Sequence, residues 1–202
     1  MAVNTALNVD GCDFHKLFPG IRRFGVTLNG CFMCPLFREW MLAMGYIGPD
    51  KAALAGKLRR GESIVLLPGG AAEALLAKPK TMRLIRRTGF LRLAKETGAW
   101  LVPCIGFGEN DAFATISLRP GSFGAVLQNR LYKILSFSTP VLASPMCVAT
   151  PMTVVVGAPL DPSAPGCLAD HYWKAVSDLY YEHRDRYGYA GVPLEFIDRN
   201  RK

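Results

Sequence analysis

The chain has 202 residues, of which half are hydrophobic and a fifth are charged, and its formal net charge at pH 7 is +8. A chain of this size and composition forms one domain with a packed core, which excludes the intrinsically disordered class. The excess of positive charge favours an anionic partner: nucleic acid, a phospholipid surface or a phosphate-bearing cofactor. Because the sequence has neither zinc-finger spacing nor an aromatic block of the RNA-binding type, we favour a phosphate-bearing cofactor or a membrane surface and expect no nucleic-acid partner.

The first part of the chain is expected to form two helices. Residues 31–44 carry apolar side chains at helical spacing, and residues 51–60 form a shorter helix with positive charge near its end. Six cysteines are scattered along the sequence, and only Cys31 and Cys34 form a CxxC pair. Zinc would need two more ligands at suitable spacing, so we expect buried or half-buried free cysteines and no metal site.

The stretch from residue 63 to residue 111 is the most informative part of the sequence. Residues 64–67 are a continuous apolar run, typical of a strand buried on both faces, and Pro-Gly-Gly at 68–70 (the PGG turn) ends it. Glu73 falls in the first turn of the following helix, where free N–H groups and the helix dipole favour a carboxylate. Open α/β sheets place their chemistry at this position, just beyond the end of a buried strand. The expected elements are a helix at 71–77, a basic segment, a helix at 90–97, a strand at 100–105 and an acidic loop at 107–111.

The last part of the chain contains an uncharged stretch, residues 134–160, which is long enough for a transmembrane helix. Four prolines argue against one straight helix, and we expect a buried strand at 153–156 instead. The residues before it either pack in the core, touch a bilayer or line an apolar groove. Apolar residues at helical spacing predict an amphipathic helix over 168–187, closed by Gly188. The alternation of strands and helices predicts an α/β fold with a mostly parallel sheet flanked by helices.

Several blocks of the sequence resemble one family. PGGAAEAL, RTGF followed by LRLA, GAWLVP and FGEND are similar, in this order, to blocks of the diacylglycerol acyltransferase type 2 family, and FPGIRRFGVTLNGCF resembles the block that precedes them. The resemblance implies a fold like that of glycerolipid acyltransferases. It also implies O-acyl transfer from acyl-CoA to a mono- or diacylglycerol, or to a long-chain alcohol, in triacylglycerol synthesis.

The same resemblance implies where and with what the protein works. It places the protein at the cytosolic face of the endoplasmic reticulum membrane, in contact with the membrane surface and able to associate with related acyltransferases. Acyl-CoA is the co-substrate, and no further cofactor is expected.

Glu73 is the candidate catalytic residue. In related acyltransferases the acidic residue after the glycine turn is thought to orient the base or the acceptor hydroxyl, and a helix-capping carboxylate is the alternative. Gly69 and Gly70 would let the backbone approach a substrate closely, although a plain tight turn needs the same residues.

The other candidate substrate-binding residues are basic or lie in the acidic loop. Arg83 and Arg87 could hold the phosphates of coenzyme A, with Arg86 and Arg92 nearby, and a solvated basic face is the alternative. Within the loop at 107–111, Glu109 and Asp111, with Asn110 between them, could bind a hydroxyl group or a cation. A role in capping the loop is the alternative for these residues.

Two departures from the family bear on the mechanism. The family's base is attributed to a histidine in a His-Pro-His-Gly block, which the sequence lacks, so we expect a single domain, residues 1–202, that is incomplete at its N-terminus and has no membrane anchor. His15 lacks the neighbouring Pro and Gly, and His183 is expected to pack in the C-terminal helix. A His-Gly-Arg-Gly-like block is also missing between residues 133 and 153. We therefore expect impaired catalysis; the alternative is a catalytically silent homologue that acts as a lipid-surface or partner-binding protein.

Overall fold

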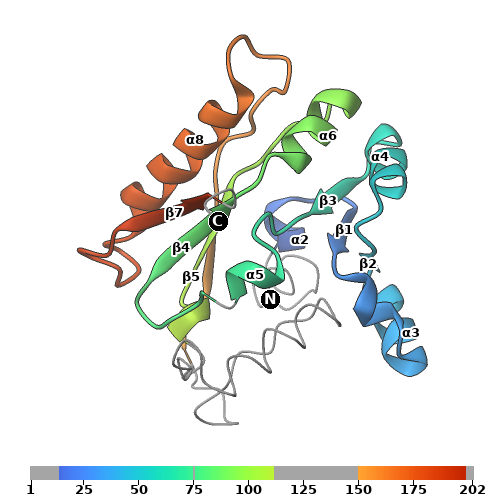
Figure 1. The fold of residues 1–202 in the computed structure, drawn as a ribbon, viewed down its shortest axis with the longest axis horizontal. Helices are drawn as coiled ribbons and strands as arrows, with labels where there is room; N and C mark the ends of the chain where they lie inside the picture. The colour runs from blue at the N-terminus through green and yellow to red at the C-terminus, as the bar shows by residue number, and fades with distance from the viewer. Residues whose placement is uncertain (1–13, 75, 112–149, 199–202) are drawn as a thin grey trace.

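The computed structural model describes residues 14–74, 76–111 and 150–198, and these combine helices with short strands (Figure 1). The predicted α/β class is therefore confirmed. In chain order the elements are α2 (Phe14–Leu17), β1 (Arg23–Val26), the 3-10 helix η1 (Asn29–Phe32), α3 (Pro35–Ala43), β2 (Tyr46–Ile47), α4 (Lys51–Arg59), β3 (Ser63–Val65), α5 (Ala71–Ala74), β4 (Met82–Arg86), α6 (Gly89–Thr97), β5 (Cys104–Phe107), η2 (Glu109–Asp111), β6 (Thr153–Val156), α8 (Leu168–His183) and β7 (Leu194–Asp198).

The described strands form three small sheets instead of the one mostly parallel sheet that the sequence predicted. One sheet has the order β2-β1-β3 with both pairings parallel, and β4 pairs with β7 in a second parallel sheet. The third sheet pairs β5 with β6 in antiparallel orientation. Parallel pairing thus predominates. However, β3, which precedes the PGG turn, and β5, which follows α6, lie in different sheets.

The largest hydrophobic core lies beneath α8. Figure 1 shows this helix running beside β4 and β7. Its inward side chains meet those of β4, α6 and β5, and Tyr180 and Tyr189 are almost completely buried. The ring of Phe107 stacks on Tyr180 with centroids 5.8 Å apart and meets Tyr189 edge-on at 5.5 Å. Because Phe107 is the last residue of β5, this aromatic packing fixes the start of the acidic loop.

A second core joins α4 and α6 to the sheet of β1 and β3. Its buried members are Val26, Leu54, Ala55 and Leu93. The two helices occur where the sequence predicted them. Asp50 caps α4 by accepting a hydrogen bond from the Ala53 N–H at 2.8 Å. Gly98 ends α6 in the left-handed conformation, with φ 69°.

The helix predicted over residues 31–44 is shorter and differently buried. The chain forms η1, breaks at Cys34, whose backbone is extended, and restarts as α3 at Pro35, because a residue before proline avoids the helical region. Leu36 and Trp40, which helical spacing places on related faces, are 87% and 53% exposed, and Met41 is the buried residue of α3.

Several other predicted bounds need correction. The strand expected at 64–67 is Ser63–Val65 and only half-buried, because β3 is the edge of its sheet. The strand expected at 100–105 is Cys104–Phe107, since Pro103 has no N–H to donate within a ladder. The helix expected at 71–77 is the single turn Ala71–Ala74, and α8 ends at His183, before the predicted end at residue 187.

The strand predicted at 153–156 is confirmed as β6, whereas most of the uncharged stretch before it lies outside the described residues. Among the residues that the structure describes, no helix combines the length and apolar character needed to span a bilayer. Cys31 is buried and Cys104 half-buried, as expected, but Cys34 and Cys167 are exposed.

Candidate functional site

The two glycines of the PGG turn serve different structural needs. Gly69 is buried, and a methyl group there would lie 2.5 Å from Cβ of Glu73 and overlap its carboxylate. Gly70 has open space around it but takes φ 59°, a left-handed conformation that other residues rarely adopt. Gly69 is thus required for space and Gly70 for backbone conformation, and together they direct the chain from β3 into α5.

Glu73 connects the PGG turn to the neighbouring strand. Its Oε2 accepts a hydrogen bond from the backbone N–H of Ile85 in β4 at 3.0 Å, so the carboxylate bonds to β4 instead of to the N–H groups of its own one-turn helix. Burial raises the pKa of Glu73, and the charge of Glu109 raises it further, while the Ile85 N–H and the positive charge of Arg87 act in the opposite direction. A half-buried carboxyl group with a raised pKa beside a glycine turn is suited to accepting or holding a proton.

The two candidate arginines lie in different surroundings. Nη2 of Arg87 donates a hydrogen bond to the carbonyl oxygen of Gly69 at 3.1 Å, which places this guanidinium at the PGG turn. Nε of Arg83 instead forms an ion pair with Glu195 across the β4–β7 pair at 2.8 Å. Arg86 is exposed and lies over the ring of Phe196, 4.2 Å from its centroid. The structure therefore brings Gly69, Gly70, Glu73 and Arg87 together and leaves Arg83 outside this group.

Side chains of the acidic loop form hydrogen bonds to the turn that precedes β4. Nδ2 of Asn110 donates to the carbonyl of Thr81 at 2.9 Å. Asp111 accepts from the backbone N–H of Lys80 at 2.8 Å, pairs with its Nζ at 2.9 Å and accepts from the Tyr189 hydroxyl at 3.1 Å. Lys80 has φ 52°, and this set of contacts holds it in that conformation. Asn110 and Asp111 thus cap the loop, whereas Glu109 is near enough to Glu73 to influence its pKa.

Comparison with known proteins identifies the family. The diacylglycerol acyltransferase family model matches residues 1–196. The chain belongs to this family. It is 35% identical over 165 residues to Diacylglycerol O-acyltransferase 1 of Schizosaccharomyces pombe, in a match covering 75% of this chain and 48% of that protein. It is 34% identical over 210 residues to Diacylglycerol O-acyltransferase 2A of Umbelopsis ramanniana, covering 92% and 59% respectively.

A relative named for a different acyl acceptor also matches this diacylglycerol acyltransferase family member. It is 32% identical over 197 residues to 2-acylglycerol O-acyltransferase 1 of Bos taurus, covering 87% of this chain and 59% of that protein. The chain therefore spans about half to three fifths of the length of these curated relatives. No solved structure matches the chain. The family resemblance that the blocks around the PGG turn indicated is confirmed.

Two residues with raised pKa values, Cys104 and Tyr172, were not predicted as part of the site. Burial raises the pKa of the Cys104 thiol to about 11, which keeps it protonated at neutral pH. Burial also raises the pKa of the Tyr172 hydroxyl, and the negative charges that Cys104 and Glu73 carry when ionised raise it further, so Tyr172 lies near each of these two groups. The regular spacing in α8 identified Tyr172 only as a packing residue, and nothing in the sequence pairs it with Glu73.

The described histidines of this family member do not lie among the PGG-turn contacts. His15 is exposed on the one-turn helix α2, and His171 is exposed on α8. Nδ1 of His183 lies 3.0 Å from the carbonyl oxygen of Leu179, and its ring stacks on Tyr187 with centroids 6.4 Å apart. Among the described residues, no group of three or more His, Cys, Asp or Glu side chains could hold a metal ion.

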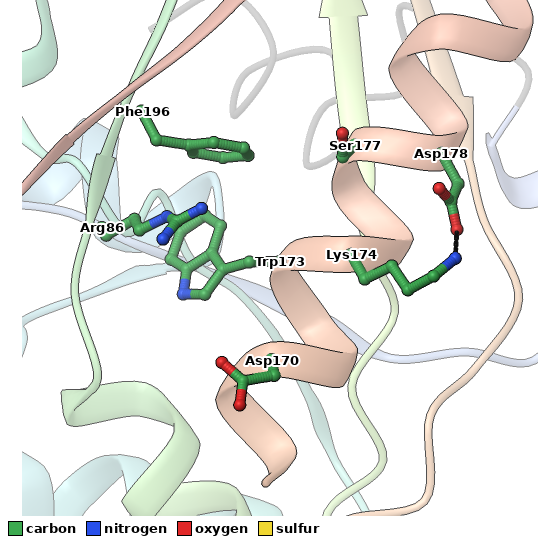
Figure 2. A pocket seen from close by; sticks show the side chains of 7 residues that line it. All are labelled: Arg86, Asp170, Trp173, Lys174, Ser177, Asp178 and Phe196. Carbon is green, nitrogen blue, oxygen red and sulfur yellow. Dashed lines mark hydrogen bonds and ion pairs between the residues drawn. The ribbon is translucent and has the colours of Figure 1, made fainter.

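A shallow groove of about 290 Å³ lies apart from the PGG turn, between α8 and the β4–β7 pair. Figure 2 shows Arg86 reaching from β4 toward the rings of Trp173 and Phe196, with Lys174 paired to Asp178 along the helix. Two bases and two acids line the groove, so it has no net preference for an anion. None of the candidate residues of the PGG turn lines it.

Proposed function

We propose that the protein catalyses O-acyl transfer from acyl-CoA to a mono- or diacylglycerol, in triacylglycerol synthesis at the cytosolic face of the endoplasmic reticulum. The observation that carries the proposal is the half-buried carboxylate of Glu73, held at a glycine turn in a chain that belongs to the diacylglycerol acyltransferase family. Relatives named for diacylglycerol and 2-acylglycerol acyl transfer support an acylglycerol as the acceptor.

The reaction requires a proton to leave the acceptor as its oxygen attacks the thioester. The acceptor oxygen forms a bond to the carbonyl carbon of the acyl group, the carbon–sulfur bond breaks, and the hydroxyl proton ends on the coenzyme A thiol. In our proposal Glu73 accepts or orients that proton, since its raised pKa makes a buried carboxyl group an effective acid or base. Gly70, which has open space around it, lets the backbone approach the acyl group, and Gly69 leaves room for the Glu73 side chain. Acyl-CoA is a co-substrate, so the proposal includes no resident cofactor.

The remaining candidate residues are assigned to substrate binding in the proposal. Arg83, which is partly exposed, is placed near the phosphates of coenzyme A, and Glu109 and Asn110 near the acceptor hydroxyl. The 202 residues contain no His-Pro-His-Gly block, so we propose that this polypeptide by itself turns over slowly. Loss of a positioned base typically lowers a rate by about two to four powers of ten.

The test is acyl transfer by the purified protein. Labelled oleoyl-CoA and dioleoylglycerol are supplied in detergent micelles, and the triacylglycerol formed is measured with wild type, Glu73→Gln and Glu96→Gln. Glu96 is a matched control because it is an exposed glutamate on α6 that pairs with Lys51, away from the turn. We expect Glu73→Gln to lower the rate by a factor of roughly 100 and the control to match wild type. Equal rates for all three proteins would remove Glu73 from the mechanism.

The second candidate is a lipid-surface protein without turnover, and the surface of α3 favours it. Leu36 and Trp40 lie one turn apart on α3 and are 87% and 53% exposed, and the ring of Phe37 stacks on Trp40. Large apolar side chains exposed together on one turn of a helix are typical of an interaction surface. In a flotation assay with phospholipid vesicles, we expect binding that survives Glu73→Ala and is lost in Leu36→Ser/Trp40→Ser. No product together with such binding would favour this candidate over the enzyme.

A further inference from the structure

The backbone of Gly69 is held from two sides by charged side chains. Its Cα faces the side chain of Glu73 so closely that no methyl group fits between them. Its carbonyl oxygen accepts a hydrogen bond from Nη2 of Arg87 at 3.1 Å. Glu73 in turn bonds to the N–H of Ile85, which precedes Arg87 by two residues. These contacts among Gly69, Glu73, Ile85 and Arg87 connect the PGG turn to the end of β4.

We propose that Arg87 is a positioning residue, which fixes the Gly69 carbonyl and so sets the surface against which the Glu73 carboxylate packs. This inference deepens the proposed function, because it concerns the same turn. It also replaces the phosphate-binding role that the sequence suggested for Arg87, since the guanidinium is engaged with the protein backbone. Arg83, paired at the surface with Glu195, keeps that role.

The environment of Arg87 supports a role inside the protein. Its Nε is buried and has no hydrogen-bond partner among the described residues. A buried N–H without an acceptor is unfavourable, so the hydrogen bond from Nη2 of Arg87 to Gly69 must offset this cost. The guanidinium also supplies positive charge close to Glu73, which favours the ionised carboxylate against the effect of burial. Arginine suits this site better than lysine, because its planar group directs a donor at the carbonyl in a fixed geometry.

The first measurement needs no catalytic turnover. Amide hydrogen exchange over residues 67–74 is compared in wild type, Arg87→Lys, Arg87→Met and the control Arg83→Met, all checked for folding by circular dichroism. We expect exchange at the turn to be at least tenfold faster in both Arg87 variants and unchanged in Arg83→Met. Arg87→Lys keeps the positive charge, so it remains informative if Arg87→Met does not fold. Unchanged exchange in Arg87→Lys would overturn the proposal.

Two further readouts separate positioning from phosphate binding. The carboxyl carbon of Glu73, assigned by its absence in Glu73→Gln, is titrated by ¹³C NMR, and we expect Arg87→Met to raise the Glu73 pKa while Arg83→Met leaves it unchanged. Coenzyme A binding is measured by calorimetry, and we expect Arg87→Lys to bind it within twofold of wild type. A tenfold weaker affinity with normal exchange at the turn would identify Arg87 as a ligand and refute the proposal. If wild type forms no triacylglycerol, the proposed function fails, but these measurements still decide the role of Arg87.

Discussion

The substitution Gly69→Ala tests the arrangement of the PGG turn most directly, and Gly70→Ala is its matched control. At Gly69 the new methyl group would overlap the side chain of Glu73, so that side chain must move and the buried N–H of Ile85 loses its acceptor. Leaving such a donor unpaired costs about 1–3 kcal/mol. Overpacking adds about 1–3 kcal/mol, so we expect a total loss of about 3 kcal/mol. At Gly70 the space is open, and the left-handed backbone alone costs about 1 kcal/mol.

Thermal unfolding followed by circular dichroism measures both effects. For a chain of this size the expected losses correspond to a fall in Tm of roughly 6–12 °C for Gly69→Ala and roughly 2–4 °C for Gly70→Ala. The double variant Gly69→Ala/Glu73→Gly removes the overlapping side chain, so its loss should be clearly smaller than the sum of the two single losses. Equal falls in Tm for the two glycine variants, or strict additivity in the double variant, would refute the steric account of Gly69.

Asp111→Ala removes the acceptor for the Lys80 N–H and should cost about 2 kcal/mol at pH 7 in urea unfolding. Burial opposes ionisation, but the hydrogen bonds from Lys80 hold the Asp111 pKa below its ordinary value, so this stabilisation is complete above about pH 4 and is lost as the pH falls further. A difference between the proteins that persists undiminished at pH 2 would contradict this. Glu73→Gln keeps an acceptor for the Ile85 N–H but removes the charge. Because burial raises the Glu73 pKa, wild type loses stability as the pH rises above about 4. The variant should therefore be more stable than wild type at pH 8 but not at pH 4. Asp50→Ala removes the cap of α4 and should cost about 1 kcal/mol, and an unchanged urea midpoint would show that the cap is dispensable.

The helices with clear end signals could be predicted from the sequence. The predicted bounds of α4 and α6 agree with the structure within one residue. Asp50 starts α4 through its capping hydrogen bond, and Gly98 ends α6 through its left-handed backbone conformation. The PGG turn and the acid after it could also be located. These features depend on residues within a few positions of one another, which a single sequence records directly.

The strands β4 and β7 could not be predicted in the same way. The sequence of β4, MRLIR, has arginines between its apolar residues, and we interpreted it as a basic segment. Its strand character depends on pairing with β7, where Leu84 lies opposite Phe196 and Arg83 opposite Glu195. Such pairing is formed by residues far apart along the chain, so no local pattern specifies it. The division into three sheets has the same origin.

The bonding of the candidate site was also beyond the sequence. The Glu73 carboxylate could be placed at the turn, but its partner, Ile85, lies twelve residues further on in a strand that we had not predicted. The apolar face of α3 shows the converse limit. Helical spacing identified an apolar face, yet spacing alone does not tell whether another element covers it, and Leu36 and Trp40 are exposed.

Helix α6 contributes to two separate cores over a very short distance. Leu91 is buried in the core beneath α8, and Leu93, two residues later, is buried in the core of α4, β1 and β3. A tilt or a register shift of this helix would therefore disturb both hydrophobic clusters at once. The two halves of the described structure are therefore coupled through α6. We expect them to unfold in one cooperative step, because the loss of α6 would remove buried side chains from both cores.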